Sequence, residues 1–322
     1  MERSHAIFSA SRLETRGHSV RFFCHLGGRQ ETLEVPSLRA NVEDDPKTQF
    51  IPELRLRDRF SLSAFEMAPL QPKAAIVNFC ELMQIGRLEE HLALLKGALR
   101  GVSPVILSAV GRDDILDELN VRLYHKAAVK LQADGVISPD DYVYEADGGY
   151  SFYQNAHFSR ALSRTHALIR FGKGKYQVIG LAIGSNLFQL QEFVHAVAEQ
   201  GVHTFAYPCG DILKGMKNAR HTLQELAAFV RYLKDSHYRS MLLGIDSPPL
   251  LRRFRPNVWS SSGWSYDAAH GLHYSYDGKP VRGRAFRCMH KPCANAVLFP
   301  DERSTLHNLM VEANLFGSEV SA

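Results

Sequence analysis

The chain has 322 residues, of which 45% are hydrophobic and 22% charged, and its formal net charge at pH 7 is +4. These values exclude a disordered chain, a collagen-like repeat and a polycation, and they are typical of a globular protein. There is no apolar run of membrane-spanning length and no signal-peptide pattern at the N-terminus, so we expect a cytoplasmic protein. Five sparse cysteines also favour a reducing compartment over a disulfide framework.

The N-terminal part of the chain alternates apolar and polar residues over 18–36, with Gly27 and Gly28 between the two halves. This pattern predicts a β-hairpin. From residue 74 onward, short apolar runs alternate with segments of helical periodicity. We expect strands at 33–40, 74–80, 105–110, 135–138, 177–183, 203–207, 240–245 and 257–261. We expect helices at 88–96, 113–131, 158–170 and 187–197, and one that begins at Thr222 with Glu225 in a capping box.

Eight strands with intervening helices predict an α/β fold, a (β/α)₈ TIM barrel that fills residues 1–322 as a single domain. A doubly wound open sheet is the alternative. No strand is followed by the glycine-rich dinucleotide fingerprint, which weakens that alternative.

A motif of metal-ligand type lies near the C-terminus. Cys288, His290 and Cys293 stand close together, and His307 follows at the start of an apolar helical pattern. Two thiolates and two imidazoles are a ligand set that Zn²⁺ accepts in tetrahedral geometry, and four protein ligands indicate a structural ion. We therefore predict a zinc-binding subdomain at 272–310, inserted before the last helix. The alternative is a pair of free thiols and an unrelated histidine.

Basic residues gather in the same part of the chain, between positions 251 and 293, against only two aspartates. Such a surface suits a nucleic-acid phosphate backbone, or it is an ordinary solvated face. The basic residues are Arg252, Arg253, Arg255, Lys279, Arg282, Arg284, Arg287 and Lys291.

In a barrel the functional site lies at the carboxyl ends of the strands. The polar and glycine residues at the predicted strand ends are Ser108, Asp140, Asp141, Gly210, Asp246 and Ser260. Their carboxylates could bind the edge of a purine-like base or act as nucleophile, acid or base. The alternative for each aspartate is an N-cap of the next helix.

Several of these motifs together resemble the tRNA-guanine transglycosylase superfamily, whose zinc signature is Cys-x-Cys-x-x-Cys followed by a histidine in His-Asn-Leu. Here the residues are Cys288, His290 and Cys293, then His307-Asn308-Leu309. Residues 133–141, which end in Asp140-Asp141, resemble the strand that carries the family's base-recognising aspartate. The resemblance implies a zinc-containing barrel enzyme, a pentosyltransferase, that exchanges guanine for a 7-deazaguanine such as preQ0.

The sequence also departs from the family pattern. Ser260 stands where the family has its nucleophilic aspartate, Ser108 where it has a second catalytic aspartate, and Ile183 where it has a base-binding glutamine. We therefore expect Asp246 as a replacement nucleophile, Ser260 and Ser108 as pocket residues, and Asp140, Asp141 and Gly210 as substrate contacts.

The short chain and the run at 260–264 look closer to the DNA-modifying branch, so we expect DNA rather than tRNA as the partner, with a flipped-out target base. A tRNA-modifying enzyme, a non-catalytic partner subunit and an unrelated metal-dependent barrel hydrolase are the alternatives. A homodimer is a further expectation.

Overall fold

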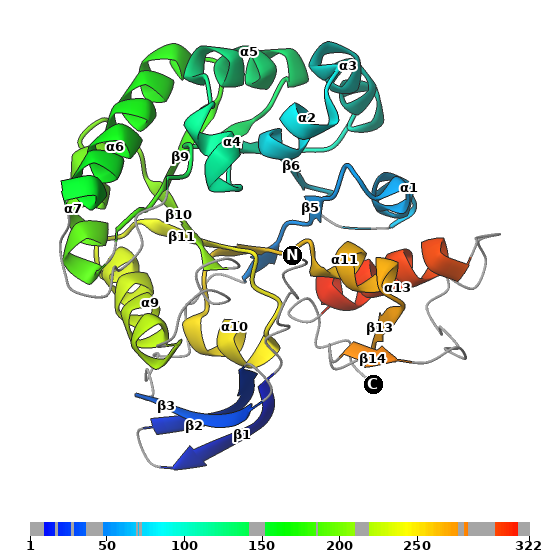
Figure 1. Ribbon diagram of the computed structural model, residues 1–322, viewed down its shortest axis with the longest axis vertical. Helices are drawn as coiled ribbons and strands as arrows, with labels where there is room; N and C mark the ends of the chain where they lie inside the picture. The colour runs from blue at the N-terminus through cyan, green and yellow to red at the C-terminus, as the bar shows by residue number, and fades with distance from the viewer. Residues whose placement is uncertain are drawn as a thin grey trace.

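The computed structural model describes residues 10–16, 19–26, 29–36, 48–68, 70, 73–141, 152–184, 186–209, 219–275, 280–282 and 300–314. Within them, nine parallel strands form one curled sheet with helices around its outside (Figure 1). The order is β4-β12-β11-β10-β9-β8-β7-β6-β5. The strands are β4 (Gln49–Phe50), β5 (Glu53–Leu54), β6 (Ala75–Asn78), β7 (Val105–Ser108), β8 (Gly135–Ile137), β9 (Gln177–Leu181), β10 (Thr204–Pro208), β11 (Arg239–Leu243) and β12 (Val258–Ser260).

The two ends of this strand order lie next to each other in the chain, because only residues 51 and 52 separate β4 from β5. The amide of Ile51 donates to the carbonyl of Trp259 at 3.0 Å, and the carbonyl of Pro52 accepts from the amide of Ile76 at 2.9 Å. Residues 49–54 therefore bind β12 on one side and β6 on the other. This arrangement is compatible with the predicted (β/α)₈ barrel.

The first strand of the sheet was placed wrongly by the sequence pattern at 33–40. Residues 33–36 belong instead to a separate antiparallel sheet of β1 (Ala10–Arg16), β2 (Ser19–Leu26) and β3 (Arg29–Pro36). Strands β2 and β3 pair from Ser19↔Pro36 to Leu26↔Arg29. The true first strand consists of two-residue pieces around a proline, so it has no periodicity to detect.

Eleven labelled helices belong to the described residues. They are α1 (Arg59–Met67), α2 (Phe79–Ile85), α3 (Leu88–Ala98), α4 (Asp113–Asp117), α5 (Val121–Leu131), α6 (Phe152–Gly172), α7 (Leu187–Ala198), α9 (Ala219–Asp235), α10 (Pro248–Phe254), α11 (Gly263–Ala269) and α13 (Pro300–Asn314). A small antiparallel pair, β13 (Leu272–Tyr274) and β14 (Pro280–Arg282), follows α11.

Two helix predictions need correction. The single helix expected at 113–131 is two helices, because the side chain of Asn120 accepts from the amides of Arg122 and Leu123 and starts α5 there. The helix expected from Thr222 begins earlier, at Ala219. Helix α9 is therefore not started by the predicted capping box.

The core lies between the sheet and its helices. Every residue of β6, β7 and β10 is buried, as expected of parallel strands covered on both faces. Trp259 and Phe205 are fully buried, and the hydroxyl of the fully buried Tyr124 lies 2.9 Å from the carbonyl of Leu107 and 2.8 Å from that of Ile137. None of the helices in the described part of the chain has the length and apolarity to cross a membrane.

Candidate active site

A cavity of about 370 Å³ opens at the carboxyl ends of the strands, where β5, β6, β7, β10, β11 and β12 give way to their following segments. This volume is in the range of small-molecule sites. Its polar lining comes from these strand ends and from helices that follow them, among them α2 and α11. The residues with side-chain N, O or S atoms are Glu53, Arg55, Asn78, Cys80, Glu81, Gln84, Ser108, Arg112, Cys209, Asp246, Ser247, Ser261, Ser262, Tyr266 and Asp267.

Oxygen atoms from three elements converge at Gly263, the first residue of α11. A methyl group added to this glycine would lie 2.8 Å from Oδ2 of Asp246, 3.0 Å from Oγ of Ser261 and 3.1 Å from the phenol oxygen of Tyr274. The missing side chain at residue 263 is therefore what lets these groups approach one another. Its amide also donates to Oγ of Ser261 at 2.8 Å.

Glu312 of α13 lies behind this convergence and is 1% exposed. Its Oε1 accepts from the hydroxyl of Ser261 at 3.4 Å, and its Oε2 has no hydrogen-bond partner. Burial raises the pKa of Glu312 well above its ordinary value, and the nearby carboxylates of Asp246 and Asp267 raise it further. Glu312 therefore keeps its proton to a higher pH than an exposed glutamate does.

Tyr274 joins the same cluster from β13. Its hydroxyl donates to Oδ2 of Asp267 at 2.9 Å, and both side chains are buried. Burial raises the pKa of Tyr274 well above its usual range, and Glu312, Asp246 and Asp267 add to the effect. The phenol thus stays protonated and acts as a hydrogen-bond donor within the cluster.

On another part of the wall, Arg55 lies directly after β5, and its guanidinium carbon is 4.8 Å from the ring centre of Tyr266. The neighbouring carboxylates hold the surrounding backbone and side chains. Glu81 Oε2 accepts from the amide of Leu56 at 2.7 Å. Glu53 Oε1 accepts from the side-chain amide of Asn78 at 3.0 Å.

The two cavity thiols are poor candidates for a nucleophile. Burial, with a contribution from Asp140, raises the pKa of Cys80 to about 12. Burial also raises the pKa of Cys209 far above its ordinary value. Since the thiolate is the reactive form, neither cysteine supplies it at neutral pH.

The structure brings only some of the predicted catalytic residues to the cavity. Asp246 and Ser108 line it. Ser260, expected as a pocket residue, is 0% exposed and is not part of the lining, and its hydroxyl has no hydrogen-bond partner among the described residues.

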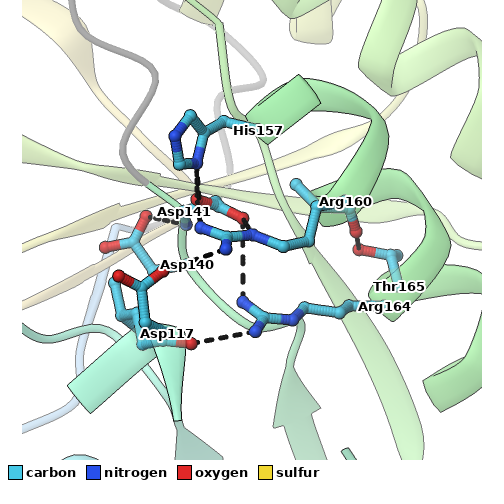
Figure 2. A network of polar contacts seen from close by, with 9 residues as sticks. Asp117, Asp140, Asp141, His157, Arg160, Arg164 and Thr165 are labelled. Carbon is cyan, nitrogen blue, oxygen red and sulfur yellow. Dashed lines mark hydrogen bonds and ion pairs between the residues drawn. The ribbon is translucent and has the colours of Figure 1, made fainter. Parts of the chain in front are cut away.

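Asp140 and Asp141, expected as substrate contacts, do not line the cavity. They belong to a network of polar contacts with α6 (Figure 2). Arg160 donates to both carboxylate oxygens of Asp141, from Nε to Oδ2 at 2.6 Å and from Nη2 to Oδ1 at 2.7 Å. Nδ1 of His157 is 2.8 Å from Oδ1, and Arg164 is 3.6 Å from Oδ2. Asp140 Oδ1 accepts from the amide of Asp141 at 2.8 Å. Asp141 therefore fixes α6 against the end of β8.

The other predicted site residues are harder to place. Gly210, Cys288, His290 and Cys293 lie outside the described residues. His307 is 1% exposed in α13, and its Nε2 donates to the carbonyl of Tyr274 at 2.7 Å. Among the residues that the structure describes, no group of three or more His, Cys, Asp or Glu is placed to hold a metal ion. The zinc site stays a prediction.

Sequence reasoning missed several groups of this site, namely Arg55, Tyr266, Asp267, Tyr274 and Glu312. A signal existed for the second and third of these. Gly263, Tyr266 and Asp267 are spaced i, i+3 and i+4, which puts them on one face of a helix that follows a strand end.

No family model matches the chain, and neither does any curated protein. Solved structures do show similarity. One is an N-acetylneuraminate lyase from Mycoplasma synoviae, with 12% identity, 70% of this chain and 73% of that chain covered, and a TM-score of 0.42. A second is the aldolase QR15, with 14% identity, coverage of 69% and 93%, and a TM-score of 0.46. A third is a putative dihydrodipicolinate synthetase from Pseudomonas aeruginosa, with 13% identity, coverage of 69% and 71%, and a TM-score of 0.42.

Similarity at this level assigns neither a family nor a reaction to this chain. These matches are nevertheless a lyase, an aldolase and a synthetase, so the predicted membership of the transglycosylase superfamily is wrong. The predicted pentosyltransferase activity, the exchange of guanine for a 7-deazaguanine and the DNA-modification role are wrong with it. The geometry gives a physical reason, because the position that would carry the nucleophile is Ser260, which the cavity does not reach.

Proposed function

We propose that the chain is an enzyme that moves a proton to or from a small polar substrate by carboxyl general acid–base catalysis. The observation that supports this proposal is the convergence of Asp246, Ser261 and Tyr274 at Gly263, with the buried Glu312 hydrogen-bonded to Ser261. Two carboxyl groups in different environments, one on the cavity wall and one buried with a raised pKa, are a common arrangement for an acid and a base.

In this proposal Asp246 is the group that exchanges a proton with the substrate, because it lines the cavity and carries a carboxylate. Ser261 connects the cavity to Glu312, since its hydroxyl is hydrogen-bonded to Oε1 of that acid and the residue lines the cavity. Tyr274 and Asp267 are positioning residues that hold the cluster by the bond between them.

An acid–base role is favoured over imine chemistry by the residues of the wall. An imine with a carbonyl substrate needs a lysine amine in the cavity. The described residues that line this cavity include two arginines and no lysine. They include two thiols, but both have raised pKa values.

The proposal also includes details of the fold that go beyond the curled parallel sheet of the described residues. In this proposal the fold is a (β/α)₈ barrel of residues 1–322 with an N-terminal β-hairpin and a zinc-binding insert at 272–310. His307, which is buried in α13, would be one of its ligands. Cys288, His290 and Cys293 would supply the other ligands, and the ion would stabilise the insert rather than take part in the reaction.

The test is proton exchange in heavy water. The chain is incubated in D₂O with a pool of small polar metabolites, and mass spectrometry identifies any compound that gains deuterium or is consumed. The wild type should label or convert at least one compound, and Asp246→Asn should reduce that rate by roughly 100-fold or more. Asp235→Asn, an exposed residue at the end of α9, is the matched control and should leave the rate unchanged. Equal labelling by Asp246→Asn and the wild type would refute the proposal.

A further inference from the structure

The guanidinium of Arg55 stands out among the charged groups of the cavity wall. The residue is half-buried, and within the described part of the chain its guanidinium has no ion pair or hydrogen bond. Arg112, on the same wall, is exposed and already bound to Asp114 through two hydrogen bonds of 3.1 and 2.9 Å. Arg55 is thus the arginine of this wall that retains its capacity to bind an anion.

Two glutamates of the cavity wall, Glu53 and Glu81, form hydrogen bonds with other groups. Glu53 is hydrogen-bonded to Asn78 across the start of the sheet, and Glu81 is hydrogen-bonded to the amide of Leu56. The second of these contacts holds the backbone beside Arg55, and the amide of Arg55 itself is hydrogen-bonded to Oγ of Ser61 at 3.0 Å. The backbone at Arg55 and Leu56 is therefore held in place by side-chain hydrogen bonds.

Tyr266 fixes the guanidinium further. The group lies over the tyrosine ring at 4.8 Å from its centre, a distance at which a cation is attracted to the ring face. A planar guanidinium held on an aromatic face presents its N–H groups along its edge, in the geometry that binds two oxygens of a carboxylate or phosphate. Holding the side chain in place in advance reduces the entropy lost when the anion binds.

Helix α11 carries both Tyr266, which holds Arg55, and Gly263, where the groups of the proposed proton transfer converge. Tyr266 follows Gly263 by three residues, so the two lie on the same face of α11, separated by roughly 5 Å along the axis. Gly263 is the point where Asp246 and Ser261 converge. An anion at Arg55 would therefore place the rest of a small molecule against Asp246.

We propose that Arg55 binds an oxyanion of the substrate, so the substrate class is a small molecule with a carboxylate or phosphate group and, a few bonds away, an O–H, N–H or C–H group that faces Asp246. This inference rests on the proposed function for the role of Asp246. The anion-binding role of Arg55 stands on its own geometry.

The experiment measures thermal stabilisation of the full chain by acetate and by inorganic phosphate, with ionic strength held constant by chloride. The wild type should show saturable stabilisation by at least one of the two anions. Acetate alone would indicate a carboxylate substrate, and phosphate alone a phosphate ester. Arg55→Gln should weaken binding at least tenfold. Arg55→Lys should also weaken it, because a lysine keeps the charge but loses the planar edge, and it decides the matter if Arg55→Gln fails to fold.

Arg239→Gln is the control, since Arg239 is exposed at the opposite end of β11. It should bind as the wild type does. Anion binding that is unchanged in both Arg55 variants, or that is absent from the wild type, would overturn the inference. Asp246→Asn separates the two proposals. If it keeps anion binding but loses deuterium exchange, both stand. If it keeps both, the oxyanion site stands and the acid–base function fails.

Discussion

Arg160 donates two hydrogen bonds to the carboxylate of Asp141, from Nε to Oδ2 and from Nη2 to Oδ1. The side chain of Asp141 is fully buried, and that of Arg160 is 33% exposed. The pair joins the end of β8 to α6 (Figure 2). A paired carboxylate of this kind is costly to break, because the guanidinium that remains loses its buried partner and keeps the half-exposed Asp117.

The first prediction follows from this pair. Asp141→Asn should lower the free energy of unfolding by about 3–5 kcal/mol, the cost typical of breaking a buried ion pair. Asp117→Asn is the matched control, because Asp117 also contacts Arg160 but is 48% exposed. Its effect should be within about 1 kcal/mol. Urea unfolding at neutral pH measures both, and equal losses in the two variants would contradict the assignment.

The second prediction concerns Gly263. Gly263→Ala should destabilise the chain by about 1–3 kcal/mol and abolish the proposed proton exchange, because its methyl would push apart Asp246, Ser261 and Tyr274. Gly97→Ala should be neutral or stabilising by up to about 1 kcal/mol, since Gly97 lies within α3 and a methyl there meets nothing within 4 Å. Thermal melts and the exchange assay measure the pair. If the Gly263→Ala chain has the stability and proton exchange of the wild type, neither property depends on the close packing of these three side chains at residue 263.

The third prediction uses the buried acid. The folded chain keeps Glu312 protonated above its ordinary value of 4.5, whereas the unfolded chain ionises it there. The folded state then holds one more proton, so this residue makes stability fall as the pH rises above 4.5, with a slope of up to ~1.4 kcal/mol per pH unit until the raised pKa is reached.

Glu312→Gln, which cannot ionise, should remove this slope. The measurement is the free energy of unfolding in urea at a series of pH values from about 5 to 8. Glu66→Gln, at an exposed position of α1, should keep the wild-type slope. An identical pH dependence in Glu312→Gln and the wild type would mean that Glu312 is ionised in the fold.

The fourth prediction concerns the proposed zinc insert. The purified chain should contain about one zinc per molecule by elemental analysis, and a strong chelator should lower its melting temperature, because a structural ion contributes to folding. Cys288→Ser should lose the metal, whereas Cys24→Ser, at a cysteine outside the motif, should keep it. A metal-free chain whose melting temperature is insensitive to chelator would argue for the alternative of two free thiols.

Much of the sheet could be predicted, because its strands are fully buried and therefore appear as continuous apolar runs. The run at 105–110 contains β7, and the run at 240–245 contains most of β11. The first strand could not be predicted, since four residues split around Pro52 have no pattern, and only the partners on both sides make them a strand.

The site was predictable only where a polar residue directly followed a strong strand, as Asp246 follows β11. Asp141 met the same criterion but has a structural role, because Arg160, 19 residues later, takes its carboxylate. Glu312 gave no signal at all. A glutamate within a helix usually faces solvent, and its contact with Ser261, 51 residues away, depends on how α13 packs.

The position of α13 has a consequence for how the protein is made. This helix packs against α1, an early helix of the chain, and against α11, a late one (Figure 1). It supplies Glu312 to a cluster whose other acids, Asp246 and Asp267, emerge from the ribosome earlier. A chain that ends before α13 would therefore leave the hydroxyl of Ser261 without its acceptor on Glu312.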